Sequence, residues 1–163
     1  MATDIDSAFL NIVSQNLGIA HKIARVYFDD SAAREDAVQE MMYQLWRSFP
    51  SFDHRSKFST WMYRVCLNTA LTHFAKAKRT SSIPLSPQHE NIPDTAGEDE
   101  EMAALMEAVS SLTKLNRAIV LLYMEGLSYE EIASITGLTQ GNVSVRLVRI
   151  RKELEAFVKR QHG

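Results

Sequence analysis

The chain has 163 residues, of which 45% are hydrophobic and 23% charged, a composition typical of a folded globular protein rather than a disordered one. Its one cysteine, Cys66, excludes an internal disulfide, and its 5 histidines lack the spacing of metal ligands. No apolar run is long enough to cross a bilayer, and residues 1–20 lack the basic cluster of a signal peptide. These features predict a cytoplasmic protein with no structural metal and no cofactor.

The net charge of −2 is unevenly distributed along the chain. Residues 1–80 contain ten Lys or Arg against eight Asp or Glu, and residues 103–163 contain eight against six. Residues 81–102 contain six acidic residues and no basic one. Both ends of the chain are therefore mildly basic, as a nucleic-acid-binding protein requires, and the acidity is confined to the middle.

The first part of the chain predicts two helical segments. Apolar residues at helical spacing cover residues 5–28, with Gly18 expected to break or weaken that helix midway. Residues 29–31 form a turn and cap signal, and Ser31 is the expected start of a second helix, which ends just before Pro50. The residues expected to be buried on this second helix are Ala37, Met41, Leu45 and Trp46, and its more polar sides carry Arg34, Asp36, Gln39 and Glu40.

A loop dense in aromatic and basic residues follows over residues 49–58, and a third helix is expected from about Ser59 to Arg79. One stripe of this helix is apolar, whereas another combines an indole, a guanidinium and an amide. Rings that stack on unpaired bases, an amide that reads a base edge and cations that hold phosphates suit a single-strand binding surface. The apolar stripe contains Tyr63, Leu67, Ala70 and Phe74, the second stripe contains Trp61, Arg64, Asn68 and Thr72, and the basic end contains Lys76, Lys78 and Arg79.

The alternative interpretation of this helix is that Phe58 and Trp61 are core residues, which is the usual place of aromatic side chains in a helical domain. Asn68 favours a surface role, because asparagine is a poor residue for a helix interior unless its amide makes a specific contact. From the sequence alone, the two interpretations have about equal support.

Residues 81–102 form a predicted flexible linker, since they contain three prolines, many polar residues and an acidic run, but no helical or strand periodicity. The acidic run at Glu98–Met102 is expected to begin the next helix. The linker divides the chain into two small domains, residues 1–80 and residues 103–163.

The second domain is also expected to be helical. Helices are predicted from about Glu101 to Ser110 and from Lys114 to Glu125, and Gly126 suits the end of the latter. Leu127–Lys152 then predicts two further helices joined by a tight turn. Within it, Ser128 and Glu131 form a capping box, Gly137 suits a left-handed turn, and Thr139 can cap the last helix.

The last helix has an apolar side and a basic side. The apolar side contains Val143, Leu147, Ile150 and Leu154, and the outer sides contain Arg146, Arg149, Arg151 and Lys152. These features together predict a helix-turn-helix that reads DNA, with an ordinary helical hairpin and solvated arginines as the alternative. The predicted fold class is therefore all-α, and because no catalytic signature occurs, the chain is not expected to be an enzyme.

The order of these segments resembles that of bacterial RNA polymerase sigma factors of the extracytoplasmic-function (ECF) type, which contain only regions 2 and 4. The resemblance rests on residues 35–40, residues 58–65 with Asn68, and residues 127–151, and it extends from about Phe9 to Phe157. It implies a protein that binds core RNA polymerase, directs it to specific promoters and helps to melt promoter DNA. Promoter DNA, the polymerase clamp coiled coil and flap, and an anti-sigma factor are the implied partners, without insertion into a membrane.

The resemblance also assigns residues to three tasks. The clamp coiled coil would be bound by Asp36, Gln39 and Glu40. The minus-ten element would be melted and held by the loop 49–58 together with Phe58, Trp61, Tyr63, Arg64, Asn68, Lys76, Lys78 and Arg79. The minus-thirty-five element would be read in the major groove by Gln140, Asn142, Ser144, Val145, Arg146, Arg149 and Arg151.

Two departures from the family pattern affect these expectations. Residues 112–115 lack the proline usual at the start of their helix, so the geometry of that helix start is not fixed by the resemblance. Ser144 and Val145 stand where the family often has more polar or basic residues, which leaves few hydrogen-bond donors for bases. This favours the hypothesis that the minus-thirty-five element is read partly through DNA shape.

Two other functions remain open at the level of sequence. A one-component transcription regulator would use residues 1–80 for sensing or dimerisation and would bind a palindromic duplex site without polymerase. A helical adaptor would bind polymerase without opening DNA.

Overall fold

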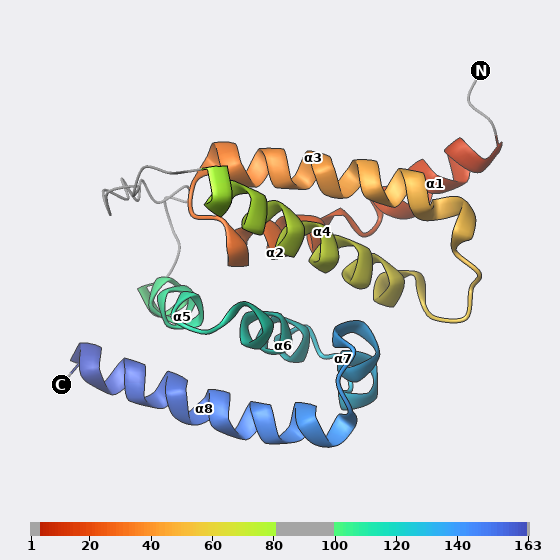
Figure 1. The fold of residues 1–163 in the computed structure, drawn as a ribbon. Helices are drawn as coiled ribbons and strands as arrows, with labels where there is room; N and C mark the ends of the chain where they lie inside the picture. Colours follow the sequence, from red (N-terminus) through yellow and green to blue (C-terminus); the bar gives the residue numbers. More distant parts are fainter. Residues whose placement is uncertain (1–3, 81–99, 163) are drawn as a thin grey trace. The chain divides into compact units, whose positions relative to one another are not determined.

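The computed structural model describes residues 4–80 and 100–162, and these residues form helices and turns with no strand among them. The chain divides into two compact units, residues 1–89 (unit 1) and residues 90–163 (unit 2). This division falls within the predicted linker, of which residues 81–99 lie outside the described part. Each unit is a small helical assembly with its own core (Figure 1), which agrees with the predicted all-α class.

Unit 1 is built around three packed helices, α2, α3 and α4, with α3 and α4 running side by side (Figure 1). Its core is made of large side chains without exposed surface, Ile23, Met41, Leu45 and Met62, together with Cys66. The elements are α1 (Asp4–Ser14), α2 (Leu17–Tyr27), α3 (Ser31–Ser48), the 3-10 helix η1 (Phe49–Ser51) and α4 (Phe58–Thr80). The predicted apolar stripe of α4 is confirmed, since Tyr63, Leu67 and Ala70 are buried and Phe74 packs on Tyr27 and Phe28.

One helix boundary differs from the prediction, and the start of α3 agrees with it. The break in the first helical segment precedes Gly18 and lies at Asn16, whose side-chain amide donates to the carbonyl of Ile12 (2.8 Å). α3 begins at Ser31 as predicted, and within the cap signal 29–31 the capping residue is Asp30, whose carboxylate accepts the backbone N–H of Ala33 (2.7 Å). Both side chains take over backbone groups that the helix ends leave unpaired.

The prediction that Trp46 is buried was wrong. Ala37, Met41 and Leu45 are spaced four residues apart and occupy the inner side of α3 completely. Trp46 lies about 100° round the helix from Leu45 and is 54% exposed. Its indole N–H donates to the carboxylate of Asp6 in α1, at the long distance of 3.4 Å.

Cys66 is buried in the core of unit 1, and burial raises the pKa of its thiol from 9.0 to about 12 because the thiolate would lose its hydration. We expect a thiol reagent to label the folded protein very slowly at about pH 8, and to label it at once after unfolding. Above pH 9, only the unfolded chain loses the proton, so stability falls as the pH rises from 9 towards 12. Rapid labelling of the folded protein would contradict this packing.

Unit 2 consists of α5 (Glu100–Ser110), α6 (Lys114–Met124), α7 (Tyr129–Thr136) and α8 (Gln140–His162), and α8 packs against the other three helices. The end of the predicted linker, residues 100–102, forms the first turn of α5, as its acidic residues suggest. The largest fully buried side chains of this unit are Ile119, Leu122, Ile132, Val143 and Ile150.

The start of α6 is fixed without the proline that the family usually has there. The hydroxyl of Thr113 accepts the backbone N–H of Asn116 (3.3 Å) and so caps the helix. Arg117 then reaches back and donates to the carbonyls of Leu112 (3.0 Å) and Ser110 (2.6 Å). A cap and one arginine therefore hold the turn between α5 and α6.

The predicted caps of α7 and α8 are confirmed. The Ser128 hydroxyl accepts the backbone N–H of Glu131, and the Glu131 carboxylate accepts that of Ser128, each at 3.1 Å. Gly137 ends α7 with a φ of +80°, and the Thr139 hydroxyl accepts the backbone N–H of Asn142 (3.1 Å). Two helices joined by the turn 137–139 are the geometry that a helix-turn-helix needs.

The turn at Gly137 gives a prediction about stability. A Cβ added there would meet nothing within 4 Å, so Gly137→Ala should cost only the left-handed backbone energy, about 1 kcal/mol. Gly18 lies within α2 and is equally open, so Gly18→Ala should instead stabilise its unit slightly, by less than about 1 kcal/mol. Urea denaturation followed by circular dichroism measures both changes, and equal signs for the two variants would contradict the argument.

Candidate nucleic-acid interface

Four aromatic rings meet where η1 and the following loop reach the start of α4. The centroid of the Trp61 ring lies 5.1 Å from that of Phe52, 5.5 Å from that of Phe58 and 6.4 Å from that of Phe49. All four side chains are half-buried. We call Phe49, Phe52, Phe58 and Trp61 the aromatic cluster. The predicted alternatives, core packing and surface contact, are thus combined, because the rings pack on one another and still present surface to solvent.

The loop that carries the cluster has a fixed turn. The carboxylate of Asp53 accepts the backbone N–H of Arg55 (3.2 Å) and also forms an ion pair with its guanidinium (3.0 Å). His54, between them, has a φ of +62°, and its ring lies 4.5 Å from that of Phe52. The ion pair is exposed and contributes little energy, whereas the turn hydrogen bond sets the path of the chain.

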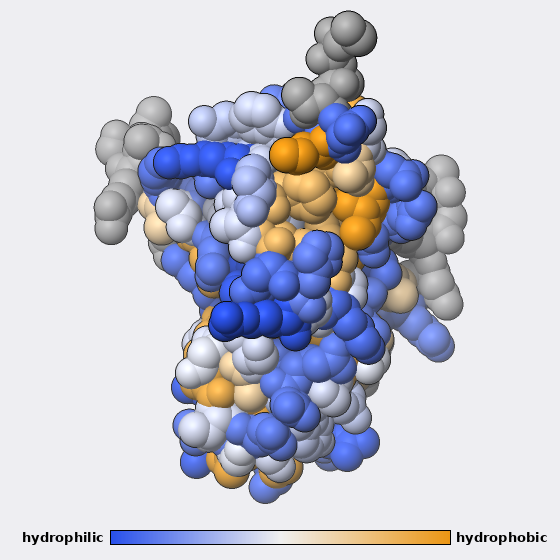
Figure 2. Space-filling model, turned by 90° about the vertical axis from the view of Figure 1, so that its right-hand side faces the viewer, coloured by the Kyte–Doolittle hydropathy of each residue, from blue (hydrophilic) through white to orange (hydrophobic). Residues whose placement is uncertain are grey.

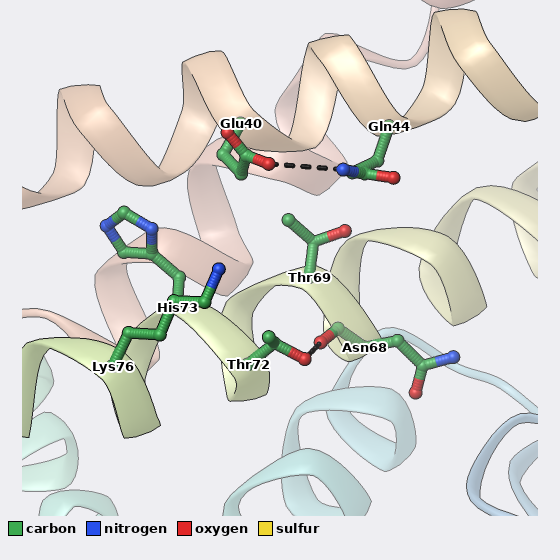
Figure 3. A pocket seen from close by; sticks show the side chains of 7 residues that line it. All are labelled: Glu40, Gln44, Asn68, Thr69, Thr72, His73 and Lys76. Carbon is green, nitrogen blue, oxygen red and sulfur yellow. Dashed lines mark hydrogen bonds between the residues drawn. The ribbon is translucent and has the colours of Figure 1, made fainter. Parts of the chain in front are cut away.

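The second stripe of α4 lies beside the cluster on the outer side of the helix. Trp61 and Arg64 are half-buried, Asn68 and Thr72 are exposed, and the Asn68 amide points away from α3 (Figure 3). Lys76 continues this side and is exposed, whereas the side chains of Lys78 and Arg79 lie outside the described part. The structure therefore brings the aromatic cluster, a guanidinium and an amide onto one surface.

Tyr63 has to be removed from the predicted DNA-contacting residues. Its side chain is only 4% exposed and belongs to the core of unit 1. It lies two residues after Trp61, about 200° round α4, so the two rings face opposite sides of the helix.

A polar hollow of about 360 Å³ lies between α3 and α4 (Figure 3). Its lining residues are Glu40, Gln44, Asn68, Thr69, Thr72, His73 and Lys76. The Glu40 carboxylate accepts the side-chain amide of Gln44 (3.1 Å) at the edge of this hollow, and Glu40 is half-buried. Of the residues expected to bind the polymerase clamp, Asp36 and Gln39 are exposed, whereas Glu40 lies at the edge of the exposed surface that these two residues form.

Two aromatic residues that sequence reasoning missed lie on the same side of α3 as Asp36 and Gln39. Tyr43 is 52% exposed and Trp46 is 54% exposed. Positions 36, 39, 43 and 46 follow the i, i+3, i+7, i+10 spacing of one helix face, which the sequence already contains. We call these four residues the outer face of α3.

Trp46 also joins the outer face of α3 to an apolar area near the start of α1. Figure 2 shows apolar side chains gathered on this part of unit 1, with hydrophilic residues around them. A hollow of about 200 Å³ lies here, lined by Ile5, Asp6, Phe9, Trp46, Arg47, Phe49 and Pro50.

In unit 2, α8 separates its buried side from its outer side as predicted, but Ser144 and Arg146 lie between the two. Val143 and Ile150 are buried, whereas Gln140, Asn142, Val145, Arg149 and Arg151 are exposed and Ser144 is half-buried. Arg146 is also half-buried, and its guanidinium donates to the side-chain oxygen of Asn116 in α6 (3.1 Å). Arg146 is therefore held at the edge of the outer side rather than at its centre.

Family models match both units. A model of sigma-70 region 2 matches residues 12–80, and a model of sigma-70 region 4 matches residues 102–154. The ECF RNA polymerase sigma-E factor of Escherichia coli K12 is 32% identical over 156 residues, which cover 85% of this chain and 82% of the relative. The chain belongs to the ECF sigma factors.

The ECF sigma factor SigM of Mycobacterium tuberculosis H37Rv is also similar to this sigma factor, with 29% identity over 135 residues, 82% of this chain and 68% of SigM. Two solved structures share its fold at 22% identity. RpoE of Bartonella quintana, in complex with the anti-sigma factor NepR, has a TM-score of 0.77 and covers 93% of this chain and 97% of its own. CnrH, in complex with the cytosolic domain of CnrY, has a TM-score of 0.69, with coverages of 94% and 88%.

The family gives this sigma factor its function, which is to direct RNA polymerase to promoters. The aromatic cluster and the outer face of α3 lie within the region 2 match, and the outer side of α8 lies mostly within the region 4 match. Among the described residues, no group of three or more His, Cys, Asp or Glu side chains could hold a metal ion. None of the helices in the described ranges combines the length and the apolar character needed to cross a membrane.

Proposed function

We propose that this sigma factor opens promoter DNA with unit 1 and selects the upstream promoter element with unit 2. In this division, residues 1–80 form the region 2 domain, residues 81–102 the linker and residues 103–163 the region 4 domain. The observation that carries the proposal is the aromatic cluster, which is half-buried and lies beside Arg64 and Asn68 on α4.

Strand opening needs a surface that binds an unpaired base better than a paired one. Taking a base out of the duplex costs a few kcal/mol, and stacking on a protein ring returns about 1–3 kcal/mol for each base. Phe58 and Trp61 present such rings, Arg64 can stack or bind phosphate, and the Asn68 amide can read the edge of a flipped base. Lys76, Lys78 and Arg79 at the end of α4 hold the phosphates of the minus-ten element.

The outer face of α3 binds the clamp coiled coil of core RNA polymerase. Asp36 and Gln39 supply a charge and an amide for polar contacts, and Tyr43 and Trp46 supply the large side chains that dominate binding energy at protein interfaces. Glu40 contacts the clamp only at the edge of this face, since its carboxylate already accepts a hydrogen bond from the Gln44 amide.

In unit 2, α8 enters the major groove of the minus-thirty-five element. The residues that face the groove are Gln140, Asn142, Ser144, Val145, Arg149 and Arg151, while Arg146, held by Asn116, reaches the edge of the groove. Each unit alone binds DNA weakly. Attachment of both units to one polymerase, with unit 2 on the flap, raises the effective concentration of the second contact.

The protein acts in the cytoplasm, where promoter DNA and RNA polymerase are found, and an anti-sigma factor controls its availability. The complex of RpoE with the anti-sigma factor NepR, which shares this fold, supports this part of the proposal.

Reconstitution with core RNA polymerase tests the proposed function. We expect start-site-specific run-off transcription, and permanganate reactivity of thymines in the minus-ten element, only when the sigma factor and core polymerase are both present. Specific binding of the purified protein alone, as a dimer on a palindromic duplex, would instead identify a one-component regulator. Tight polymerase binding without reactive thymines would identify an adaptor that does not open DNA.

A further inference from the structure

Two exposed valines lie next to each other on the outer side of α8. Val145 is 50% exposed and Val148 is 54% exposed. Each lies two residues from a fully buried residue, Val143 or Ile150, and therefore about 200° round the helix from the core. The valines thus form an apolar centre on the side of α8 that faces away from α5, α6 and α7.

The surroundings of this valine pair match a DNA groove. Asn142 and Arg149 flank it and are exposed, and both can make hydrogen bonds to base edges. Gly141 lies one turn before Val145 and has no side chain, and a Cβ added there would meet only the Thr139 hydroxyl, at 4.0 Å. No side chain therefore projects from the helix surface at this position. A backbone or base edge can therefore approach the valines closely.

A structural role in the helix does not explain why valine stands at positions 145 and 148. Valine is a mediocre helix former, and a solvated helix position is filled better by Ala, Lys, Glu or Gln. Arg146, which lies between the valines in sequence, is turned to the edge by its hydrogen bond to Asn116. The centre of the DNA-facing side is consequently apolar, and about half of the surface of each of its two methyl-bearing side chains is exposed.

We infer that Val145 and Val148 contact the 5-methyl groups of thymines in the major groove of the minus-thirty-five element. Thymine is the only standard DNA base with an apolar group at the major-groove edge, and apolar side chains recognise it by direct contact. This inference rests on the proposed function of unit 2. It replaces part of the expected shape readout with a direct contact that needs no hydrogen-bond donor.

Uracil substitution tests the contact, because uracil keeps every hydrogen-bonding group of thymine and lacks only the methyl group. Holoenzyme is reconstituted from core polymerase and the full-length sigma factor, and promoter duplexes carry deoxyuridine at one thymine of the minus-thirty-five element at a time. We expect about a fourfold loss of wild-type affinity at one or two positions, which corresponds to losing one buried methyl group. Val145→Ala and Val148→Ala should each weaken binding to the thymine promoter and remove the uracil effect at the position that the replaced valine contacts.

The matched control is Val158→Ala, because Val158 is another exposed valine (41%) further along α8. This variant should retain the full difference between thymine and uracil. Equal binding of wild-type holoenzyme to thymine and uracil at every position would overturn the inference. So would a uracil effect that persists unchanged in both alanine variants, since the methyl group would then act through DNA shape.

The same reactions distinguish a failure of the inference from a failure of the proposed function. Start-site-specific transcription on the unmodified promoter, together with equal binding to thymine and uracil, would overturn the thymine contact alone. Absence of promoter-specific transcription with core polymerase would overturn both.

Discussion

Replacing Trp61 by alanine is expected to reduce promoter opening by the holoenzyme by roughly tenfold to a hundredfold, the equivalent of one lost stacking contact with a base. Trp61 is the ring of the aromatic cluster that lies on the same stripe of α4 as Arg64 and Asn68. Binding to core polymerase should remain unchanged, because the outer face of α3 is not altered. Permanganate reactivity of minus-ten thymines, measured against time at saturating holoenzyme, reports the opening rate.

The control for this prediction is Trp61→Phe, which keeps an aromatic ring for Phe52 and Phe58 and should open promoters within a few-fold of wild type. Thermal denaturation of both variants shows whether loss of the indole has also loosened the cluster. Asn68→Ala provides a second test without a packing cost, because Asn68 is exposed. Wild-type opening rates for both Trp61→Ala and Asn68→Ala would contradict the proposed role of this surface.

The helices and their caps could be predicted because they depend on residues close in sequence. The capping box at Ser128 and Glu131, the left-handed Gly137 and the Thr139 cap all act within a few residues, and the structure confirms each of them. The start of α3 at Ser31 is confirmed as well, although Asp30 and Ser31 are both good caps and only the backbone path shows that Asp30 is the one that caps the helix.

The errors concern side chains whose position depends on packing between distant segments. Tyr63 and Trp61 are both aromatic, and only the arrangement of α2 and α3 against α4 shows which of them is buried. Trp46 was expected to be buried, but it follows Leu45 directly, and Leu45 already fills the buried place on α3. A helical wheel limits such choices but does not identify the neighbouring helix.

The sequence was sufficient to select the segments that form the candidate site, but not to predict the contacts among their side chains. The loop and the α4 stripe could be selected from their aromatic and basic residues, whereas the contacts among the rings of the aromatic cluster required the turn at Asp53 and the path of η1. Arg146 could not be separated from Arg149 by sequence, because its partner Asn116 lies 30 residues away in α6. Long-range contacts of this kind decide which polar side chains remain available for DNA.

Trp46→Ala is expected to weaken binding of the sigma factor to core RNA polymerase by about thirtyfold or more, since interface tryptophans often contribute at least 2 kcal/mol. Trp46 is 54% exposed, stands in line with Asp36, Gln39 and Tyr43, and does not belong to the buried core of unit 1 that Leu45 occupies. Its replacement should therefore leave the stability of unit 1 nearly unchanged. Titration of labelled sigma factor with core polymerase measures the affinity directly.

Leu17→Ala is the matched control for Trp46→Ala, because Leu17 is another large apolar side chain with substantial exposure (40%) but belongs to α2 and not to the outer face of α3. It should bind core polymerase like wild type. Tyr43→Ala should share the defect of Trp46→Ala, and the double variant should lose less than the sum if the two rings contact one partner surface. If Trp46→Ala and Tyr43→Ala both bound with wild-type affinity, the clamp would have to be bound elsewhere, and the two exposed rings on α3 would belong to a different interface.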